Sequence, residues 1–191
     1  MTVATTAEVS YTQSNAVTSN LLCLMGQFPI RVECWGKLAE ASKTIQVETP
    51  VIVTGSLRVF EDNTFRIIAS SIQPVAPGLN LNLACVVGRA GGDPQTRFFD
   101  PEKSVSKFRL AMKRKAEVTD WVNVEFWDRT AEICTDYVCK GSLVGINGEL
   151  KIETWNDKTT GEPRSKPVIK GDKLHLLGGN NKAEQRQSVA A

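Results

Sequence analysis

The chain lacks most of the residues from which catalytic and metal sites are built. It has a single histidine, His175, and its five cysteines form no C-x-x-C pair. A zinc site needs closely spaced histidine or cysteine ligands, so none is expected. There is also no G-x-x-x-x-G-K-[ST] phosphate loop and no G-x-S-x-G nucleophile motif. We therefore expect a protein that is not an enzyme and that uses no metal or cofactor.

Long hydrophobic runs and a strong net charge are missing too. No apolar stretch approaches the roughly 20 residues of a membrane-spanning helix. The formal net charge is only +2 over 191 residues, so the local placement of the cations has to show whether the partner is a polyanion. An odd number of cysteines in mostly apolar surroundings is typical of reduced thiols. With no secretory signal visible, this favours a cytoplasmic, nucleoid-associated location, and a plastid stays open.

What the chain does contain is an internal repeat. Residues 30–40 (IRVECWGKLAE) match residues 122–132 (VNVEFWDRTAE) at five identical positions, the pairs Val32/Val124, Glu33/Glu125, Trp35/Trp127, Ala39/Ala131 and Glu40/Glu132. The similarity resumes with GSLR at 55–58 against GELK at 148–151. Two matches at nearly constant spacing indicate one folding unit used twice.

The repeat and the local composition predict the domain organisation. Pro74, Pro77 and Gly78 cannot continue a central strand, so they mark a break between the units. The polar end of the chain favours disorder. The predicted segments are a loose lead-in over 1–15, a diverged unit over 16–75, a linker over 76–80, a second unit over 81–178 and a disordered tail over 179–191.

The second unit shows the fuller set of elements. Apolar alternation predicts three strands, then a short helix capped by Asp128, then two more strands on either side of a polar loop. This is the element order of the OB-fold, a five-stranded Greek-key barrel that commonly binds oligonucleotides. The fold class is therefore mainly β, with two OB-fold units. The first is shorter and shows no opening strand, so its barrel is either incomplete or covered at one edge by something else. The strands are expected over 81–88, 105–112, 121–127, 143–155 and 168–177, and the polar loop over 156–166.

Tryptophans occupy outward positions on two of these strands. In 121–127 the inward positions are taken by valines and a phenylalanine, which leaves Trp121 and Trp127 on the polar face. Trp155 lies opposite the inward aliphatic residues of its own strand. Aromatic platforms beside cations are how a groove binds single-stranded nucleic acid. Each tryptophan alone could instead pack over the helix or cap a barrel end, but three on one face favour a binding surface.

Basic residues are close in sequence to the tryptophans. Lys113 to Lys115, taken alone, would be a solvated hairpin tip. Together with the aromatics, however, the cations predict a surface on which bases stack and phosphates are bound. Its expected members include Trp35 at the repeated position of the first unit: Trp35, Arg97, Lys107, Arg109, Lys113, Arg114, Lys115, Trp121, Trp127, Lys151, Trp155, Arg164 and Lys166.

Several segments resemble the single-stranded DNA-binding proteins of bacteria and organelles. They are NLACVVGRAGGDPQTRF from residue 82, DWVNVEFWDRTAEICTDYVCKGSLVGINGEL from 120, KIETWNDKTTGEP from 151 and LHLLGG from 174. The resemblance implies a barrel that wraps single-stranded DNA without sequence preference, with stacking aromatics at Trp121, Trp127 and Trp155, and an assembly in which four barrels act together. Residues 16–75 are similar to the short cyanobacterial and plastid members of this type.

The sequence departs from that family in several places. Pro29 stands at the first-unit position that corresponds to Trp121, and Phe60 is the only aromatic residue near the position of Trp155. The loop over 113–120 lacks the extra tryptophan often found there. The chain ends KAEQRQSVAA rather than in the acidic tip that recruits replication enzymes. We therefore expect the first unit to bind weakly or to serve mainly in assembly.

Two functions of different classes follow from these features. The leading hypothesis is sequence-independent binding of single-stranded DNA in replication, repair and recombination, by a homodimer that supplies four barrels. The alternative is an OB-fold scaffold in a protein complex, with nucleic-acid binding weak or lost. A preference for RNA also stays open, because no residue in the sequence distinguishes a 2′-hydroxyl.

Overall fold

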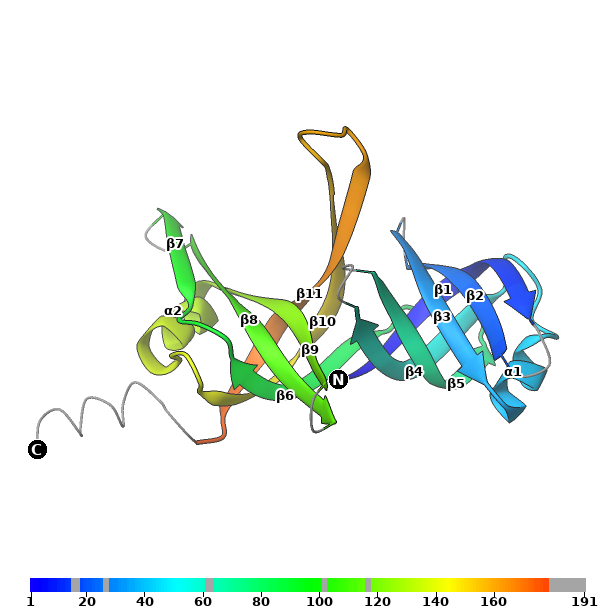
Figure 1. The fold of residues 1–191 in the computed structure, drawn as a ribbon, viewed down its shortest axis with the longest axis horizontal. Coiled ribbons are helices and arrows are strands. Elements are labelled where there is room, and N and C mark those ends of the chain that lie inside the picture. The colour runs from blue at the N-terminus through cyan, green and yellow to red at the C-terminus, as the bar shows by residue number, and fades with distance from the viewer. Residues whose placement is uncertain (15–17, 26–27, 61–63, 101–102, 116–117, 179–191) are drawn as a thin grey trace, which may run out of the picture. The chain divides into compact units, whose positions relative to one another are not determined.

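The computed structural model describes residues 1–14, 18–25, 28–60, 64–100, 103–115 and 118–178. The chain divides between Leu83 and Ala84 into two compact units, each built mainly from strands (Figure 1). The predicted mainly β class with two OB-fold units is confirmed. The predicted linker over 76–80 lies in a segment without strand or helix, just before this division.

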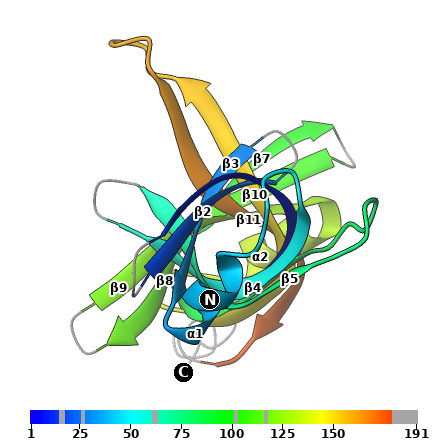
Figure 2. The ribbon, with the colours of Figure 1, turned by 90° about the vertical axis from the view of Figure 1, so that its right-hand side faces the viewer.

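Unit 1 is a closed barrel of five strands. Its order is β2-β3-β5-β4-β1, and β1 also pairs with β2, which joins the two ends of the sheet. Figure 2 looks along this unit and shows the strands curling into a ring. The first barrel is therefore complete, with no uncovered edge between β1 and β2. Its elements are β1 (Thr2–Ser14), β2 (Thr18–Met25), β3 (Phe28–Trp35), α1 (Lys37–Ser42), β4 (Pro50–Val59) and β5 (Phe65–Pro74).

The prediction of a loose lead-in over 1–15, with the first unit starting at residue 16, is wrong. Residues 2–14 form β1, which pairs with both β2 and β4. The buried side chains at its start are Val3, Thr5 and Ala7. Because two of these three are small or polar, the segment lacks the hydrophobic alternation by which a strand is recognised. Backbone pairing on both sides defines β1 instead.

Unit 2 repeats this topology with one addition. Its order is β6-β10-β11-β9-β8-β7, and a pairing between β6 and β8 closes the barrel. As β3 runs parallel to β5, so β9 runs parallel to β11. The added strand, β7, lies outside the barrel along β8 and is absent from the sequence-based prediction. The elements are β6 (Asn82–Ala90), β7 (Gln95–Asp100), β8 (Lys103–Lys115), β9 (Val118–Trp127), α2 (Asp128–Tyr137), β10 (Leu143–Asn156) and β11 (Pro163–Leu176).

The polar stretch 156–166, predicted to be a loop, is partly strand. β10 runs to Asn156 and β11 starts at Pro163, so the connection is residues 157–162 alone. Arg164 and Lys166 therefore lie on β11. Figure 1 shows this hairpin projecting from the barrel of unit 2. Beyond the barrel no core covers the ribbon, so its side chains are polar and its sequence resembles a loop.

The residues of the repeat occupy the same places in both units. The matched valines are buried in the third strand of each barrel, and the matched alanines are buried on each helix. Trp35 and Trp127 each end that strand and precede the helix. The identities therefore reflect one shared packing arrangement of strand and helix, made by Val32, Val124, Ala39 and Ala131.

The turn from strand into helix uses a left-handed backbone in both units. Gly36 has φ 55° and Asp128, its counterpart, has φ 50°. Glycine adopts this region freely, and aspartate is among the few other residues that enter it often. The prediction that Asp128 caps the helix is not met, because it is the first residue of α2 and the cap position has no side-chain hydrogen bond.

The second part of the repeat marks a bend. Gly55 and Gly148 each lie where the register with the neighbouring strand shifts, as at a β-bulge. A Cβ at Gly148 would collide with the backbone oxygen of Lys170, and one at Gly55 with that of Ile68. A bulge with a glycine lets a strand turn a barrel corner while another backbone passes close by.

We expect Gly148→Ala to lower the free energy of unfolding by about 2–4 kcal/mol, because the added methyl group meets backbone that cannot move aside cheaply. The control is Gly92→Ala, since a Cβ at Gly92 would have no heavy atom within 4 Å. Urea denaturation of both variants measures the difference. Equal stabilities would contradict the close-approach explanation.

Candidate nucleic-acid interface

The three tryptophans of unit 2 lie partly exposed on its outer surface. The exposed fractions are 38% for Trp121, 40% for Trp127 and 46% for Trp155. The alternating inward residues of the same strands, such as Phe126 and Leu150, are almost completely buried. The outward placement predicted from the alternation is therefore confirmed, and the barrel core does not use these indoles.

A groove of about 440 Å³ lies beside Trp121 on this surface. The turn after β6 contributes Gly91, where a Cβ would collide with the Trp121 ring. The absence of a side chain at Gly91 thus makes room for the indole. The remaining lining comes from Gly92, Asp93 and Gln95, from Lys107, Phe108 and Arg109 on β8, from Asn123 and Val124 on β9, and from Glu153, Lys166 and Val168 on β10 and β11.

Two cations lie against the aromatic rings. The Arg109 guanidinium is 4.9 Å from the centroid of the Trp121 ring, and the Lys166 ammonium is 5.6 Å from that of Trp155. Both distances fit cation–π attraction, which restrains the rings and the charges together. The surface therefore presents positive charge and π faces side by side, as stacking bases and their phosphates require.

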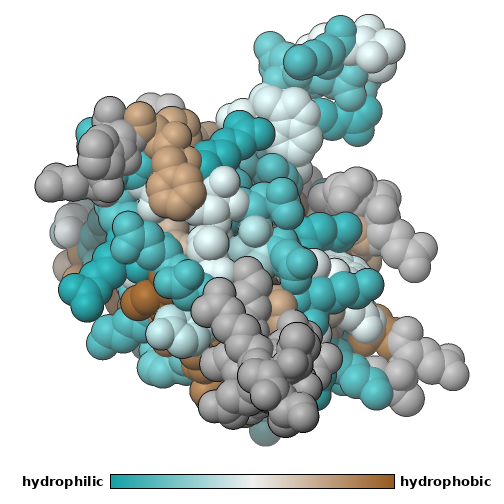
Figure 3. Space-filling model, turned by 90° about the vertical axis from the view of Figure 1, so that its left-hand side faces the viewer, coloured by the Kyte–Doolittle hydropathy of each residue, from teal (hydrophilic) through white to brown (hydrophobic). Residues whose placement is uncertain are grey.

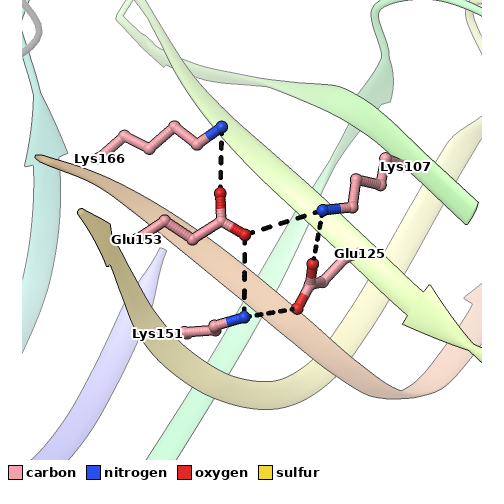
Figure 4. A network of polar contacts seen from close by, with 5 residues as sticks. All are labelled: Lys107, Glu125, Lys151, Glu153 and Lys166. Atoms are coloured by element: carbon pink, nitrogen blue, oxygen red, sulfur yellow. Dashed lines mark hydrogen bonds and ion pairs between the residues drawn. The ribbon is translucent and has the colours of Figure 1, made fainter. Parts of the chain in front are cut away.

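Three lysines and two glutamates form one network on this face (Figure 4). Glu125 lies 3.0 Å from the Lys107 ammonium and 3.4 Å from that of Lys151. Glu153 lies 3.1 Å from Lys166, 3.7 Å from Lys107 and 3.8 Å from Lys151. The lysines predicted to bind phosphates are thus already paired with carboxylates, and the five side chains have a net charge of +1.

Glu125 is the buried centre of this network. It lies on the same face of β9 as the tryptophans, yet its side chain is only 1% exposed. Burial by itself would raise the pKa of its carboxyl group. The charges of Lys107 and Lys151, whose ammonium groups both lie beside the carboxylate, outweigh burial and lower the pKa. Glu125 therefore stays ionised at neutral pH and joins the two lysines.

The other predicted cations lie apart from the groove lining. Arg114 pairs with Asp120 at 3.7 Å. Arg164 pairs with Asp157 at 3.7 Å and with Glu162 at 3.6 Å. Arg97 on β7 and Lys113 on β8 are exposed, and the side chain of Lys115 lies outside the described residues. The structure thus brings Lys107, Lys151 and Lys166 together in one network and places Arg109 against Trp121. Arg164 pairs in register with Trp155 on the hairpin, outside the groove lining.

Sequence reasoning missed the two glutamates of the network and the smaller groove residues. The signal for the glutamates was present, because strict alternation places Glu125 between Trp121 and Trp127, and Glu153 between Lys151 and Trp155. The same alternation places Asn123 on this face, whereas Gly91 offered no such signal. Gly91 reaches the groove only because β6 turns beside Trp121, which is a tertiary contact.

Unit 1 contains a simpler counterpart of this site. Glu33, at the position of Glu125, is 8% exposed and accepts a 2.8 Å hydrogen bond from Arg66. The Arg66 guanidinium also lies 4.4 Å from the centroid of the Phe60 ring. Trp35 is 51% exposed at the position of Trp127. The buried glutamate therefore recurs, but with one arginine in place of two lysines.

Neither a metal site nor a membrane-spanning helix is found among the described residues. They contain no group of three His, Cys, Asp or Glu side chains placed to bind a metal ion. No helix among them is long and apolar enough to cross a membrane.

The two cysteines whose pKa is raised most strongly are not reactive thiols. Four of the five cysteines are buried and Cys85 is exposed. Burial raises the pKa of both Cys23 and Cys134 to about 12, so these two stay as thiols.

A model of the single-strand binding protein family matches residues 81–177, which include the groove and all three outward tryptophans of unit 2. The chain belongs to this family. Single-stranded DNA-binding protein 1 of Synechocystis is 47% identical over 104 residues, which are 52% of this chain and 86% of that relative. The protein of the same name from Nostoc is 42% identical over 102 residues, with the same shares. These matches cover most of each relative but about half of this chain.

Solved structures resemble the whole chain. Two structures of the single-stranded DNA binding protein from Thermus aquaticus, a deletion mutant and the wild type, align with TM-scores of 0.74 and 0.71. Each covers 94% of this chain, at 19% and 18% identity, and 95% and 93% of the solved chains are covered in turn. At this identity the similarity shows the fold, and its extent includes both units.

We expect Glu125→Gln to lower the free energy of unfolding by about 1–3 kcal/mol at pH 7, because it weakens the contacts with both lysines. The folded pKa of Glu125 lies below its ordinary value of 4.5. The stabilisation by its charge is therefore complete above that pH and is lost as the pH falls through the folded pKa. Denaturant unfolding of both proteins at pH 7 and in acid measures this. A difference that persists undiminished in acid would show that the charge is not its source.

Proposed function

We propose that this protein binds single-stranded DNA without sequence preference through the outer face of unit 2. The observation that supports this most directly is the placement of three partly exposed tryptophans beside lysines and an arginine on one surface. Every base has a π face, so stacking on Trp121, Trp127 and Trp155 tolerates any sequence and contributes roughly 1–3 kcal/mol per base. The relatives are named single-stranded DNA-binding proteins, which agrees with this assignment.

We expect two groups of cations to bind the phosphates, one at the groove and one farther along the strands. Lys107, Arg109 and Lys166 line the groove, and Lys151 joins them through Glu125 and Glu153; these four would contact the backbone between the stacked bases. The cations farther along β7, β8 and β11 would extend the path of the strand. Binding should weaken as salt rises, with a log–log slope of about −0.7 for each phosphate neutralised. The second group consists of Arg97, Lys113, Arg114, Lys115 and Arg164.

Unit 1 would contribute less to binding. It exposes one tryptophan, Trp35, and has Pro29 at the position of Trp121. Among the described residues, the cation paired with its buried Glu33 is Arg66. A single stacking platform gives a short and weak contact, so we assign the main affinity to unit 2. The protein would act as a non-enzymatic binder that protects DNA during replication, repair and recombination, in the cytoplasm at the nucleoid.

A second function is favoured by one observation, the pairing of the groove lysines with glutamates. Because Glu125 and Glu153 neutralise much of the positive charge, the surface could serve a protein partner in a scaffold whose DNA binding is weak. Titration with oligo(dT) separates the two functions. Stacked bases quench exposed indoles, whereas a surface that serves only a protein partner leaves the fluorescence unchanged.

We further propose that two chains assemble into a homodimer with four barrels. On the outer face of β6, β10 and β11, Gly145 pairs in register with Val87 on one side and His175 on the other. Val87 is 55% exposed, and Leu177, close to the same glycine, is 49% exposed. A glycine flanked by exposed apolar side chains makes a flat strip on which a second copy can pack.

The tryptophan platforms predict specific losses of affinity. Trp127→Ala and Trp155→Ala should each weaken oligo(dT) binding by about tenfold, since one stacked base is worth roughly 1.4 kcal/mol within the usual range. Trp35→Ala should have a smaller effect. Fluorescence titration at low and moderate salt measures the affinities, and thermal melting verifies that each variant is folded. Wild-type protein that shows no quenching at low salt would rule out the proposed function.

The proposed homodimer predicts that a charge placed in the apolar strip halves the molecular mass of the protein in solution. Val87→Glu should convert a dimer into a monomer in light scattering, because it buries a charge in the apolar strip. Ile133→Glu on α2, where Ile133 is 37% exposed, introduces the same charge away from that strip and should leave the dimer intact. A wild-type protein that is monomeric at micromolar concentration would contradict the assembly.

A further inference from the structure

Three lysine ammonium groups converge on the carboxylate of Glu153. One carboxylate oxygen lies 3.1 Å from Lys166, and the other lies 3.7 Å from Lys107 and 3.8 Å from Lys151. The lysines come from three strands, β8, β10 and β11, so the fold and not one local segment brings them together (Figure 4). Several ammonium groups around one point form a site for an anion, and here a side chain of the same protein fills it.

Glu153 and Glu125 differ in their freedom to leave the lysines. The Glu125 side chain is 1% exposed, so it cannot leave without opening the packing around it. The Glu153 side chain is 25% exposed, and the lysines around it are 39–51% exposed. Ile152, just before it, is buried, whereas Thr154 and Trp155 are exposed, so Glu153 marks the point where the hairpin leaves the barrel. Its carboxylate can turn towards water without uncovering the core.

The site lies on the expected path of the strand. Glu153 lines the groove together with Trp121, Lys107 and Lys166. Lys166 contacts both the Glu153 carboxylate and the Trp155 ring. The backbone that connects a base on Trp121 with a base on Trp155 therefore passes these lysines, and a phosphate there meets charges that Glu153 already occupies.

We propose that Glu153 is a built-in competitor for a DNA phosphate. In the free protein its carboxylate occupies the site formed by Lys107, Lys151 and Lys166. When a strand binds, a phosphate takes its place and Glu153 turns to solvent. The exchange limits affinity and lets bound strands be released. This inference rests on the proposed function, because it assigns a role to one residue of the same groove.

The alternative is a purely structural role for Glu153. The two roles predict opposite changes in DNA affinity when its carboxylate is removed. If Glu153 held the lysines in the positions that DNA needs, its removal would scatter them and weaken binding. If it competes with phosphate, its removal frees the lysines and strengthens binding. The remaining carboxylate, Glu125, still orients Lys107 and Lys151 in such a variant.

The experiment compares Glu153→Gln with Glu132→Gln in oligo(dT) titrations at several salt concentrations. Glu132 is exposed on α2 outside the groove lining, so its variant has the same change in net charge. We expect Glu153→Gln to bind about three- to tenfold more tightly at moderate salt. Glu132→Gln should match the wild type.

The outcomes separate this inference from the proposed function. Wild-type binding with an unchanged or weaker Glu153→Gln variant overturns the competitor role and keeps the DNA-binding function. Binding by neither protein at low salt overturns both. Equal melting temperatures establish that the variant is folded. If it is not, Glu153→Asp, which retains the charge but shortens the reach to Lys166, replaces it and should also bind more tightly.

Discussion

Barrel closure depends on a bend in the fourth strand of each unit, and that bend requires a glycine. At Gly55 and Gly148 a neighbouring backbone oxygen lies where a Cβ would be, and the strand register shifts at the same point. The bend lets the fourth strand pair with the first strand on one side and the fifth on the other. Because the barrel closes, side chains separate strictly into an inner and an outer set. The outer set of β8, β9, β10 and β11 then forms the tryptophan and lysine surface.

Carboxylates of the same unit neutralise much of the positive charge of that surface. A net charge of +2 for the whole chain would be weak for a protein that binds a polyanion by charge alone. Pairing the lysines with Glu125 and Glu153 keeps them ordered at the groove without a strong positive field. If Glu153 competes with DNA as proposed, the affinity for DNA comes from base stacking and from the replacement of the Glu153 carboxylate by a phosphate. This explains how a nearly neutral chain can still present a phosphate-binding face.

The sequence allowed much of the barrel to be predicted, because its strands bury clear alternating residues. The inward set of β9 and the outward placement of Trp121, Trp127 and Trp155 follow from periodicity alone. Two of the exceptions share one physical cause. β1 buries Thr5 and Ala7, and the outer part of the β10–β11 hairpin buries little, so neither shows hydrophobic alternation. β7 was missed as well, as a short strand added outside the barrel. The pairing of lysines with glutamates across strands depends on register, which a single sequence does not reveal.

The two units show which part of the site belongs to the fold and which part to binding. The buried glutamate on the third strand is present in both, as Glu33 and Glu125, and each has a cation from a neighbouring strand. Counted from the matched glycines Gly55 and Gly148, Phe60 stands at the position that Glu153 has in unit 2. Unit 1 thus retains the buried ion pair and has an aromatic residue in place of the exchangeable carboxylate. The buried pair therefore belongs to the barrel itself, whereas the cluster of three lysines around Glu153 is found in unit 2 and, among the described residues, has no counterpart at Phe60.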